Sequence, residues 1–354
     1  MLCVVPLWSD EILNGTTLYA DELSSAKPKK VELLSPRSLS GWDIPSGDYS
    51  GITPVSDNRY AVVSDKSAID GFYTFRIKQD RRSGQVIEVS DWTAFGDSLH
   101  GRSGRDQEGI AFFPSDSTLW ISGEADQRIP AYRLDGSRTG QELSVPEICG
   151  KEKIYPNYGF EALTYDNTRN LFWTVTENVL KADGRVAVPG TVGPSPLRLL
   201  ALSPSGAPVA QYTYLLDEPV TRQKGRQYAF GVVALCVLDD GRLLVLEREF
   251  DVPKRYLKST VHEKLYMVRP DEADTQSSAP TLSGTEGLLR KELVTEWTTR
   301  MRLIRPRLAN YEGMCRGIVR DDGRQTLLLV SDSQGGYGKK FCHLRDWLRV
   351  IVLP

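Results

Sequence analysis

A repeated pattern of two apolar runs constrains the fold of this chain more than any other feature. Residues 106–124 read DQEGIAFFPSDSTLWISGE, and residues 159–177 read GFEALTYDNTRNLFWTVTE. Aligned on Glu108 and Glu161, both copies run from a glutamate through an apolar run and a polar turn to a second apolar run. Two apolar runs around a polar turn predict a β-hairpin. Each copy closes on a second acidic residue, which is Glu124 in one and Glu177 in the other.

Three looser copies occur at residues 48–65, 230–249 and 311–332. The glutamate position holds Ser50, Val233 and Glu312 in these copies, and their closing acidic residues are Asp65, Glu247 and Asp332. Short alternating segments such as GFYTFRI, PAYRLDG and HEKLYMVRP lie between the copies and are typical of further strands. A hairpin with one or two following strands makes a four-stranded antiparallel sheet, and radial repetition of such sheets is a β-propeller.

The repeats therefore predict an all-β fold, a single β-propeller of six four-stranded blades, with five and seven blades as the alternatives. Five copies are visible, and the sixth blade is expected near residues 185–215. The propeller is predicted to span residues 1–354 as one domain. The polar segment 270–287 is interpreted as a long loop excursion within it, because the repeats continue on both sides. The innermost strands are expected to start at Gly51, Gly109, Ala162, Val233 and Gly313.

Composition excludes several classes of function. The 354 residues carry a net charge of −2 with no basic block, which argues against a nucleic-acid partner. No apolar run reaches the ~18 residues that a membrane span requires. The five cysteines are scattered without a CxxC pair, so a zinc site built on them is not expected. The apolar start MLCVVPLWSD is interpreted either as the remainder of a trimmed export signal or as a first strand.

The recurrent carboxylates are the strongest functional signal. In a propeller the innermost strands line a central channel, so equivalent positions of successive blades form a ring around one axis. Hard cations such as Ca²⁺ prefer ~6–8 oxygen ligands, and like charges held together without a cation raise one another's pKa values. The three histidines show no paired spacing for a softer metal. We therefore predict a calcium site at one channel mouth, with candidate ligands Asp48, Asp106, Glu108, Glu161, Glu247, Glu312 and Asp332.

Plainer interpretations stand beside this one. An acidic residue at a strand end is often only a solvated terminus, and an Asp or Glu after a strand is also good turn chemistry. Arg248 is interpreted either as a contact for an anionic substrate or as the partner of a neighbouring carboxylate. Trp120 and Trp173 are expected to be packing residues between blades. The sequence contains neither a G-x-S-x-G elbow nor an HExxH motif, so hydrolysis would proceed by metal-assisted attack of water.

Four ordered motifs carry a family resemblance. DQEGIAFF, NYGFEALTYD, GRLLVLEREF followed by KLYMV, and NYEGM followed by DGRQTLLLVSD together resemble the phytase-like, "esterase-like activity of phytase" family of bacterial proteins. The resemblance runs from about Asp48 to the C-terminus. It implies a secreted, periplasmic or cell-surface propeller and hydrolysis of a phosphate ester or a related ester. It also implies that Glu108, Glu161 and Glu312 are metal ligands or rim groups and that Arg248 contacts the substrate.

Two functions are carried forward. The first is a calcium-assisted hydrolase of small phosphate or carboxylic esters, lactones included, with Glu108, Glu161, Glu312 and Arg248 as the catalytic candidates. The alternative is a non-catalytic propeller that binds a ligand or a protein, with a structural cation. The two differ in one measurable property, which is calcium-dependent ester hydrolysis. The sequence carries no signal for the oligomeric state.

Overall fold

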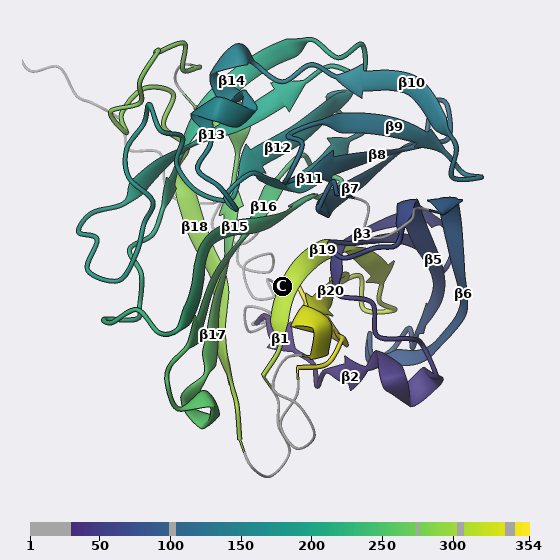
Figure 1. Cartoon of the computed structure of the whole chain (residues 1–354). Coiled ribbons are helices and arrows are strands. Elements are labelled where there is room, and N and C mark those ends of the chain that lie inside the picture. The colour runs from purple at the N-terminus through teal and green to yellow at the C-terminus, as the bar shows by residue number, and fades with distance from the viewer. Residues whose placement is uncertain (1–29, 99–103, 274–275, 303–307, 337–343) are drawn as a thin grey trace, which may run out of the picture.

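The computed structural model describes residues 30–98, 104–273, 276–302, 308–336 and 344–354. Five antiparallel sheets stand around one axis in these residues, and together they form a β-propeller (Figure 1). The innermost strands of the sheets, β3, β7, β11, β15 and β19, are neighbours in that order, and β19 lies next to β3. The all-β propeller prediction is confirmed, with the number of blades at five.

Four of the blades are four-stranded meanders built from consecutive strands. Blade 1 consists of β3 (Tyr49–Ser56), β4 (Arg59–Ser64), β5 (Ile69–Gln79) and β6 (Val86–Ser98). Blade 2 consists of β7 (Gln107–Phe113), β8 (Thr118–Gly123), β9 (Ile129–Arg133) and β10 (Arg138–Leu143). Blade 3 consists of β11 (Phe160–Asp166), β12 (Leu171–Thr176), β13 (Ser195–Leu202) and β14 (Pro208–Leu216). Blade 4 consists of β15 (Gln227–Val237), β16 (Leu243–Val252), β17 (Thr260–Val268) and β18 (Lys291–Arg300).

Blade 5 combines strands from both ends of the chain. It contains β19 (Asn310–Val319), β20 (Gln325–Asp332) and β21 (Trp347–Val352), and its outer edge is formed by β1 (Glu32–Leu33) and β2 (Arg37–Ser38). Both short strands pair antiparallel with β21. The ring of blades is therefore closed by hydrogen bonds between residues more than 300 positions apart in the sequence.

The preference for six blades was wrong for a specific reason. The segment near residues 185–215 contains β13 and β14, which are the two outer strands of blade 3. A connection of 18 residues separates β12 from β13, and the sequence between them has no alternating pattern. That long connection made two outer strands resemble the remnant of another blade.

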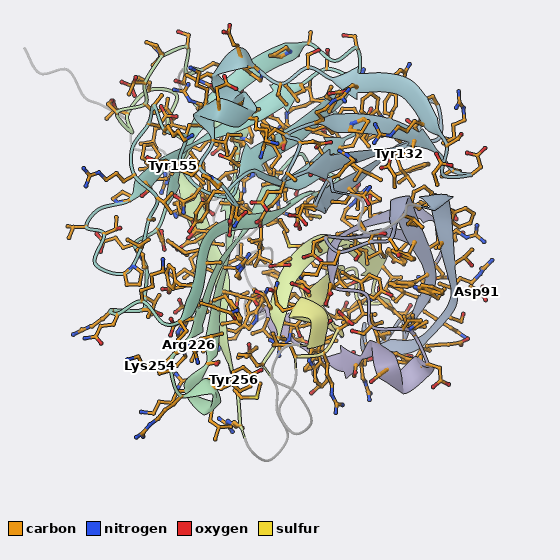
Figure 2. All side chains as sticks on the ribbon, in the orientation of Figure 1. Asp91, Tyr132, Tyr155, Arg226, Lys254 and Tyr256 are labelled. Atoms are coloured by element: carbon orange, nitrogen blue, oxygen red, sulfur yellow. The ribbon has the colours of Figure 1, made fainter. Side chains whose placement is uncertain are left out.

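The hydrophobic core is divided among the interfaces between neighbouring blades. Five clusters of buried side chains each combine residues of two adjacent blades. Trp120 is buried between blades 2 and 3, and Trp173 is buried between blades 3 and 4. Side chains fill the space between the sheets, and blade 4 projects beyond the others, with Arg226, Lys254 and Tyr256 near its projecting end (Figure 2).

The remaining regular elements are short 3₁₀ helices, and none of the helices described is long and apolar enough to cross a membrane. They are η1 (Leu39–Trp42), η2 (Glu147–Cys149), η3 (Lys151–Lys153), η4 (Tyr256–Lys258), η5 (Pro270–Glu272) and η6 (Gln334–Gly336). The polar segment 270–287 lies between β17 and β18 of blade 4. The extent of one domain over residues 1–354 stays a prediction, because residues 1–29 lie outside the described residues.

Candidate functional site

A β-bulge occurs at the same place in all five innermost strands. In each one, the pairing with the second strand shifts so that one extra residue has no partner directly opposite. The shift lies within the first four residues of β3, β7, β11 and β19, and after the sixth residue of the longer β15. A bulge leaves a residue unpaired and turns its side chain in a new direction. The residues at the shifts include Ser50, Glu108, Glu161, Val233 and Glu312, which are the five residues aligned at the glutamate position of the repeat.

These bulges lie where the inner strands approach one another most closely. A Cβ atom added at Gly51 would lie 2.3 Å from the backbone oxygen of Glu108, and one at Gly109 would lie 2.7 Å from that of Glu161. The glycine after each of these two bulges is therefore required by the neighbouring strand. The bulge residues Ser50, Glu108, Glu161 and Glu312 line the narrow central channel together.

The second strands contribute another ring of side chains at the same end of the channel. In each blade, the residue just before the bulge pairs with a residue of the second strand. The next residue along that second strand belongs to the ring, and from blade 1 to blade 5 these residues are Asp65, Glu124, Glu177, Arg248 and Asp332. Blade 4 therefore differs from the other four blades, because it places an arginine where they place a carboxylate. Its inner strand also carries the apolar Val233 at the bulge. We call this end of the channel the acidic mouth, and its carboxylates are Asp48, Asp65, Asp106, Glu108, Glu124, Glu161, Glu177, Glu312 and Asp332.

Carboxylate oxygens approach one another in three groups at the acidic mouth. Within each group, one oxygen per residue lies within 4.8 Å of the others. The groups are Asp48 with Asp65 and Asp332, Asp65 with Asp106 and Glu108, and Glu124 with Glu161 and Glu177. Asp65 of blade 1 belongs to two of the groups. One of them includes Glu108 of blade 2, and the other includes Asp332 of blade 5.

The surroundings of these carboxylates oppose their ionisation. Burial, followed by the neighbouring negative charges, raises the pKa of Glu108 and that of Asp332 well above their usual values. Burial likewise raises the pKa of Asp65 to about 7, of Glu124 to about 7 and of Glu177 to about 8. Glu161 also has a pKa raised well above its usual value by burial and by the Glu177 charge. A carboxyl whose pKa lies near 7 can exchange a proton at neutral pH.

Arg248 lies among the carboxylates and has almost no exposed surface. Its Nη2 atom is 3.0 Å from Oε1 of Glu312, 3.3 Å from Oε1 of Glu177 and 3.7 Å from Oε2 of Glu161. Its Nε atom is buried and has no hydrogen-bond partner among the described residues. Of the two interpretations offered for Arg248, pairing with neighbouring carboxylates is the one these distances describe. The guanidinium compensates part of the negative charge and orients three glutamates toward one point.

The remaining predicted ligands lie in different surroundings. Asp48 accepts hydrogen bonds at 2.6 Å from the Ser333 hydroxyl and from the backbone N–H of Gly335. Asp48 and Asp106 both have left-handed backbones, with φ of 47° and 50°, and aspartate tolerates this conformation better than most residues. Their identity therefore has a backbone reason in addition to any role in binding a cation.

Glu247 is not placed with the other carboxylates. Its side chain is buried and accepts hydrogen bonds from the Tyr214 hydroxyl at 2.6 Å and from Nζ of Lys291 at 2.8 Å. Neighbouring residues of a strand point to opposite faces of the sheet, so Glu247 and Arg248 face different surroundings. Arg248, one position later, occupies the place in the ring that the repeat alignment gave to Glu247.

Sequence reasoning missed three residues at this mouth. Lys66 forms an ion pair with Asp65 at 2.7 Å. Asn310 donates a hydrogen bond at 2.8 Å to Oε1 of Glu312. Glu263 pairs with Arg248 across β16 and β17, and its Oε2 atom is buried without a hydrogen-bond partner among the described residues. The alternating pattern of HEKLYMV contains the signal for Glu263, because its other inward-facing positions are apolar.

The donor set fits a hard cation. The Oδ1 atom of Asp65 is buried and has no hydrogen-bond partner among the described residues. Asp65 is also the residue that belongs to two of the three carboxylate groups. Oxygens that share a Ca²⁺ ion at ~2.3–2.6 Å lie within ~5 Å of one another, which matches the spacing in all three groups. Oxygen-only ligands disfavour soft metals. Asp65, Asp48 and Asp332, or Glu124, Glu161 and Glu177, are therefore suited to hold a calcium ion.

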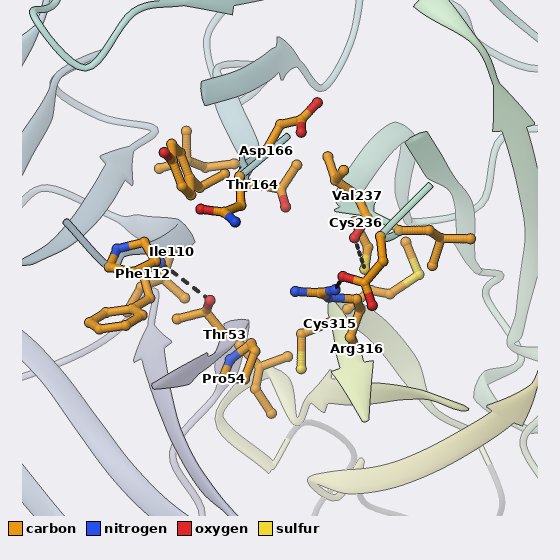
Figure 3. Close-up of a pocket in the computed structure, with 18 of the residues that line it drawn as sticks. Thr53, Pro54, Ile110, Phe112, Thr164, Asp166, Cys236, Val237, Cys315 and Arg316 are labelled. Atoms are coloured by element: carbon orange, nitrogen blue, oxygen red, sulfur yellow. Dashed lines mark hydrogen bonds and ion pairs between the residues drawn. The ribbon is translucent and has the colours of Figure 1, made fainter. Parts of the chain in front are cut away.

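The opposite end of the channel, which we call the far mouth, has a different lining. The inner strands end there around a pocket whose wall includes Ile110, Phe112, Cys236, Met314 and Cys315 (Figure 3). Arg316 and Asp239 form an ion pair at this pocket. Burial raises the pKa of the Cys236 thiol to about 12 and that of the Cys315 thiol well above its usual value, so neither thiol ionises at neutral pH.

Comparison with known proteins gives one family and only distant structural similarity. The chain has no match among curated proteins. Among solved structures it resembles a luciferin-regenerating enzyme, with 10% identity and a TM-score of 0.41 over 90% of this chain and 96% of that one. It also resembles virginiamycin B lyase from Staphylococcus aureus, with 12% identity and a TM-score of 0.34 over 92% of this chain and 100% of that one. We draw no conclusion from similarities at this level.

A family model gives the decisive comparison. The model described as "Phytase-like: Esterase-like activity of phytase" matches residues 44–334. The matched region begins just before the first inner strand and ends just after the last acidic residue of the mouth, so it contains every carboxylate of the acidic mouth. The chain belongs to the phytase-like family.

Proposed function

We propose that the protein is a calcium-assisted hydrolase of phosphate or carboxylic esters that acts at the acidic mouth. One observation supports this most: three groups of carboxylate oxygens converge at the end of one channel, and burial raises the pKa values of Glu108, Glu161 and Asp332 among them. A cation would relieve the repulsion among them. When bound, calcium would polarise the ester oxygen and lower the pKa of a bound water.

The residues of the acidic mouth have separate tasks in this proposal. Glu108 and Glu161 supply ligand oxygens from their bulges. Glu312 is fixed by its contacts with Arg248 and Asn310 and completes the ring. Whichever of Glu124 and Glu177 does not bind the cation accepts the proton of the attacking water. Arg248 keeps the glutamates oriented and stabilises negative charge that develops nearby.

The test is a substrate panel assayed with calcium and with a chelator. The panel contains an aryl phosphate, a phosphodiester, a carboxylic ester and a lactone. We expect calcium-dependent hydrolysis of at least one class, and loss of that activity in Glu161→Gln. Calcium binding without hydrolysis of any class would contradict the proposal and favour a ligand-binding propeller with a structural cation. The far-mouth pocket is where such a propeller would hold a small ligand.

The family match also supports a location outside the cytoplasm. We propose that the protein works in the periplasm, at the cell surface or after secretion, where calcium is available to a site of moderate affinity. Fractionation of the native host with antibodies against the protein tests this. Recovery of the full-length chain only with cytosolic markers would contradict it.

A further inference from the structure

A row of polar side chains lies behind the acidic mouth, on the face of blade 4 that packs against blade 5. Arg248, Glu263 and Trp297 lie directly opposite one another on β16, β17 and β18. Residues opposite each other in adjacent strands point to the same face of the sheet. Tyr311 of blade 5 faces this row, because its backbone N–H donates to Oε1 of Glu263 at 3.2 Å and its ring lies 6.4 Å from that of Trp297. The row therefore leads from the mouth into the interface between the two blades.

The members of this row have hydrogen-bonding atoms that no other described residue uses. Nε of Arg248, Oε2 of Glu263 and Nε1 of Trp297 are buried and have no hydrogen-bond partner among the described residues. Such atoms are rare in folded proteins. The first two are a donor and an acceptor on directly paired residues, whose Cβ atoms lie about 5 Å apart in a regular ladder. A change of side-chain rotamers is therefore enough to bring Arg248 and Glu263 together.

The glutamates that contact Arg248 differ in their relation to the expected cation. Glu161 and Glu177 belong with Glu124 to one of the three groups of neighbouring carboxylate oxygens. Glu312 belongs to none of the three groups, and its contact with Arg248 is the shortest, at 3.0 Å. A cation held by Glu161 and Glu177 would compete with the guanidinium for the same oxygens and repel it. Arg248 would then keep Glu312 and lose its other two partners.

Glu263 can serve as a replacement partner for Arg248. It is buried, and burial raises its pKa well above the usual value, whereas the Tyr311 N–H and the charges of Arg349 and Arg248 oppose that rise. The groups that face it are Arg248 from β16, Trp297 from β18, Tyr311 and Glu312 from β19, and Arg349 from β21. Without a cation its carboxyl is therefore protonated at neutral pH. A guanidinium that comes closer favours the loss of that proton.

We propose that Glu263 is a positioning residue that acts through Arg248. With a divalent cation in the acidic mouth, the Arg248 guanidinium keeps its contact with Glu312 and donates its Nε–H to Oε2 of Glu263. Glu263 loses its proton to solvent in this step, and its carboxylate forms an ion pair with the guanidinium. The carboxylates of Glu161 and Glu177 are then free to bind the cation. This inference rests on the cation site of the proposed function and is independent of ester hydrolysis.

The test is calorimetric titration of calcium into the wild type and into Glu263→Gln, in two buffers that differ in ionisation enthalpy. The difference between the buffers counts the protons released for each cation bound. Glutamine has the shape of the neutral glutamic acid but cannot release a proton. We therefore expect the variant to release about one proton fewer and to bind calcium about tenfold more weakly at pH 7.5. Glu292→Gln is the matched control, because it replaces an exposed glutamate on β18 of the same blade and should leave both quantities unchanged.

The pH dependence separates this role from a purely structural one. Because the wild type releases the additional proton, its calcium affinity should rise more steeply from pH 6 to pH 8 than that of Glu263→Gln. A purely structural role would lower the free energy of unfolding of the variant and leave this slope unchanged. A crystal structure of the wild type with calcium is an independent check that needs no variant. In it, Nε of Arg248 should lie within hydrogen-bond distance of Oε2 of Glu263.

The outcomes distinguish this inference from the proposed function. Calcium binding with equal proton release in the wild type and Glu263→Gln would overturn the inference and leave the hydrolase intact. Retention of all three glutamate contacts by Arg248 in the calcium-bound crystal would overturn it as well. Proton release that depends on Glu263, without hydrolysis of any ester, would support the inference and reject the hydrolase.

Discussion

The two mouths of the channel are built from the same five strands and have opposite chemistry. At the acidic mouth every inner strand has a bulge, and carboxylates converge there with raised pKa values. At the far mouth β7, β11 and β15 pair in regular register, whereas β3 and β19 each have a second register shift. The pocket there is lined by apolar side chains and by polar ones such as Thr53, Thr164 and Asn167. The bulges that all five inner strands share thus lie at the end where carboxylates gather, and the three groups of neighbouring carboxylate oxygens found in the described residues all lie at that end.

Removal of Arg248 should have the largest effect on the acidic mouth. The substitution Arg248→Met leaves three glutamates without their shared cationic partner. We expect the free energy of unfolding to fall by about 3–5 kcal/mol in calcium-free buffer at pH 8, as for other buried ion pairs that lose one member. Urea denaturation measures this, with Arg128→Met as the control, because its pair with Glu142 is exposed and should contribute below about 1 kcal/mol. An equal loss in both variants would contradict the central role of Arg248.

The next largest effect is expected on calcium affinity, which should respond to substitution at the acidic mouth but not at the far mouth. Glu161→Gln removes one charged ligand at the acidic mouth, whereas Asp239→Asn neutralises an exposed carboxylate at the far mouth. We expect the first substitution to weaken calcium binding by about tenfold or more and the second to leave it unchanged, because ligand charge sets calcium affinity. Calorimetric titration of calcium measures both. Equal binding, or none, in wild type and Glu161→Gln would indicate a solvated strand end instead of a metal site.

The pH dependence of stability follows from the raised pKa values. Asp65, Glu124 and Glu177 have folded-state pKa values of about 7, 7 and 8, against about 4 in the unfolded chain. The folded protein therefore binds more protons between pH 4.5 and 8, and its stability falls as the pH rises through that window. We expect a loss of at least about 1 kcal/mol from pH 5 to pH 8 with chelator present.

Calcium and one substitution sharpen this pH prediction. Calcium competes with protons for the same oxygens, so it should stabilise the protein more at pH 8 than at pH 5. The Glu177→Gln variant has no ionisable group at position 177. Its free energy of unfolding should therefore change less steeply with pH when chelator is present. A stability that rises from pH 5 to pH 8 in chelator would show that these carboxyls are not desolvated in the folded protein.

Substitution at the far mouth should have the smallest effect. Arg316 forms an ion pair with Asp239, which has 80% of its side chain exposed. We expect Arg316→Ala to change the free energy of unfolding by less than about 0.5 kcal/mol and to leave calcium binding and ester hydrolysis unchanged. A loss of hydrolysis in this variant would indicate that the far-mouth pocket takes part in the reaction.

Much of the acidic mouth could be predicted from the repeat. The glutamate position recurs because a bulge recurs at the equivalent residue of every inner strand. Alignment of the repeat copies predicts Glu108, Glu161 and Glu312 as equivalent residues. The positions of Asp65, Glu124, Glu177 and Asp332 followed from the antiparallel return of the second strand.

The errors came from features that a repeat does not encode. Blade 4 has an arginine in the ring position, so a search for the closing acidic residue selected its neighbour Glu247. Counting from the bulge residue identifies Arg248 instead, because Arg248 follows Val233 by the same 15 positions that separate Asp65 from Ser50. The number of blades depended on a long connection and on two-residue strands near the N-terminus, and neither has a periodic pattern.

The composite fifth blade has a consequence for how the protein is made. β1 and β2 precede the other described strands in the sequence, but they pair with β21, which follows all the others. Four meanders can form from local hairpins during translation, whereas closure of the ring must wait for a contact of very high sequence separation, and such contacts form slowly. Until then the inner strands that carry the carboxylates are not held around the axis. We therefore expect the acidic mouth to be assembled in the last step of propeller folding, after β21 has been synthesised.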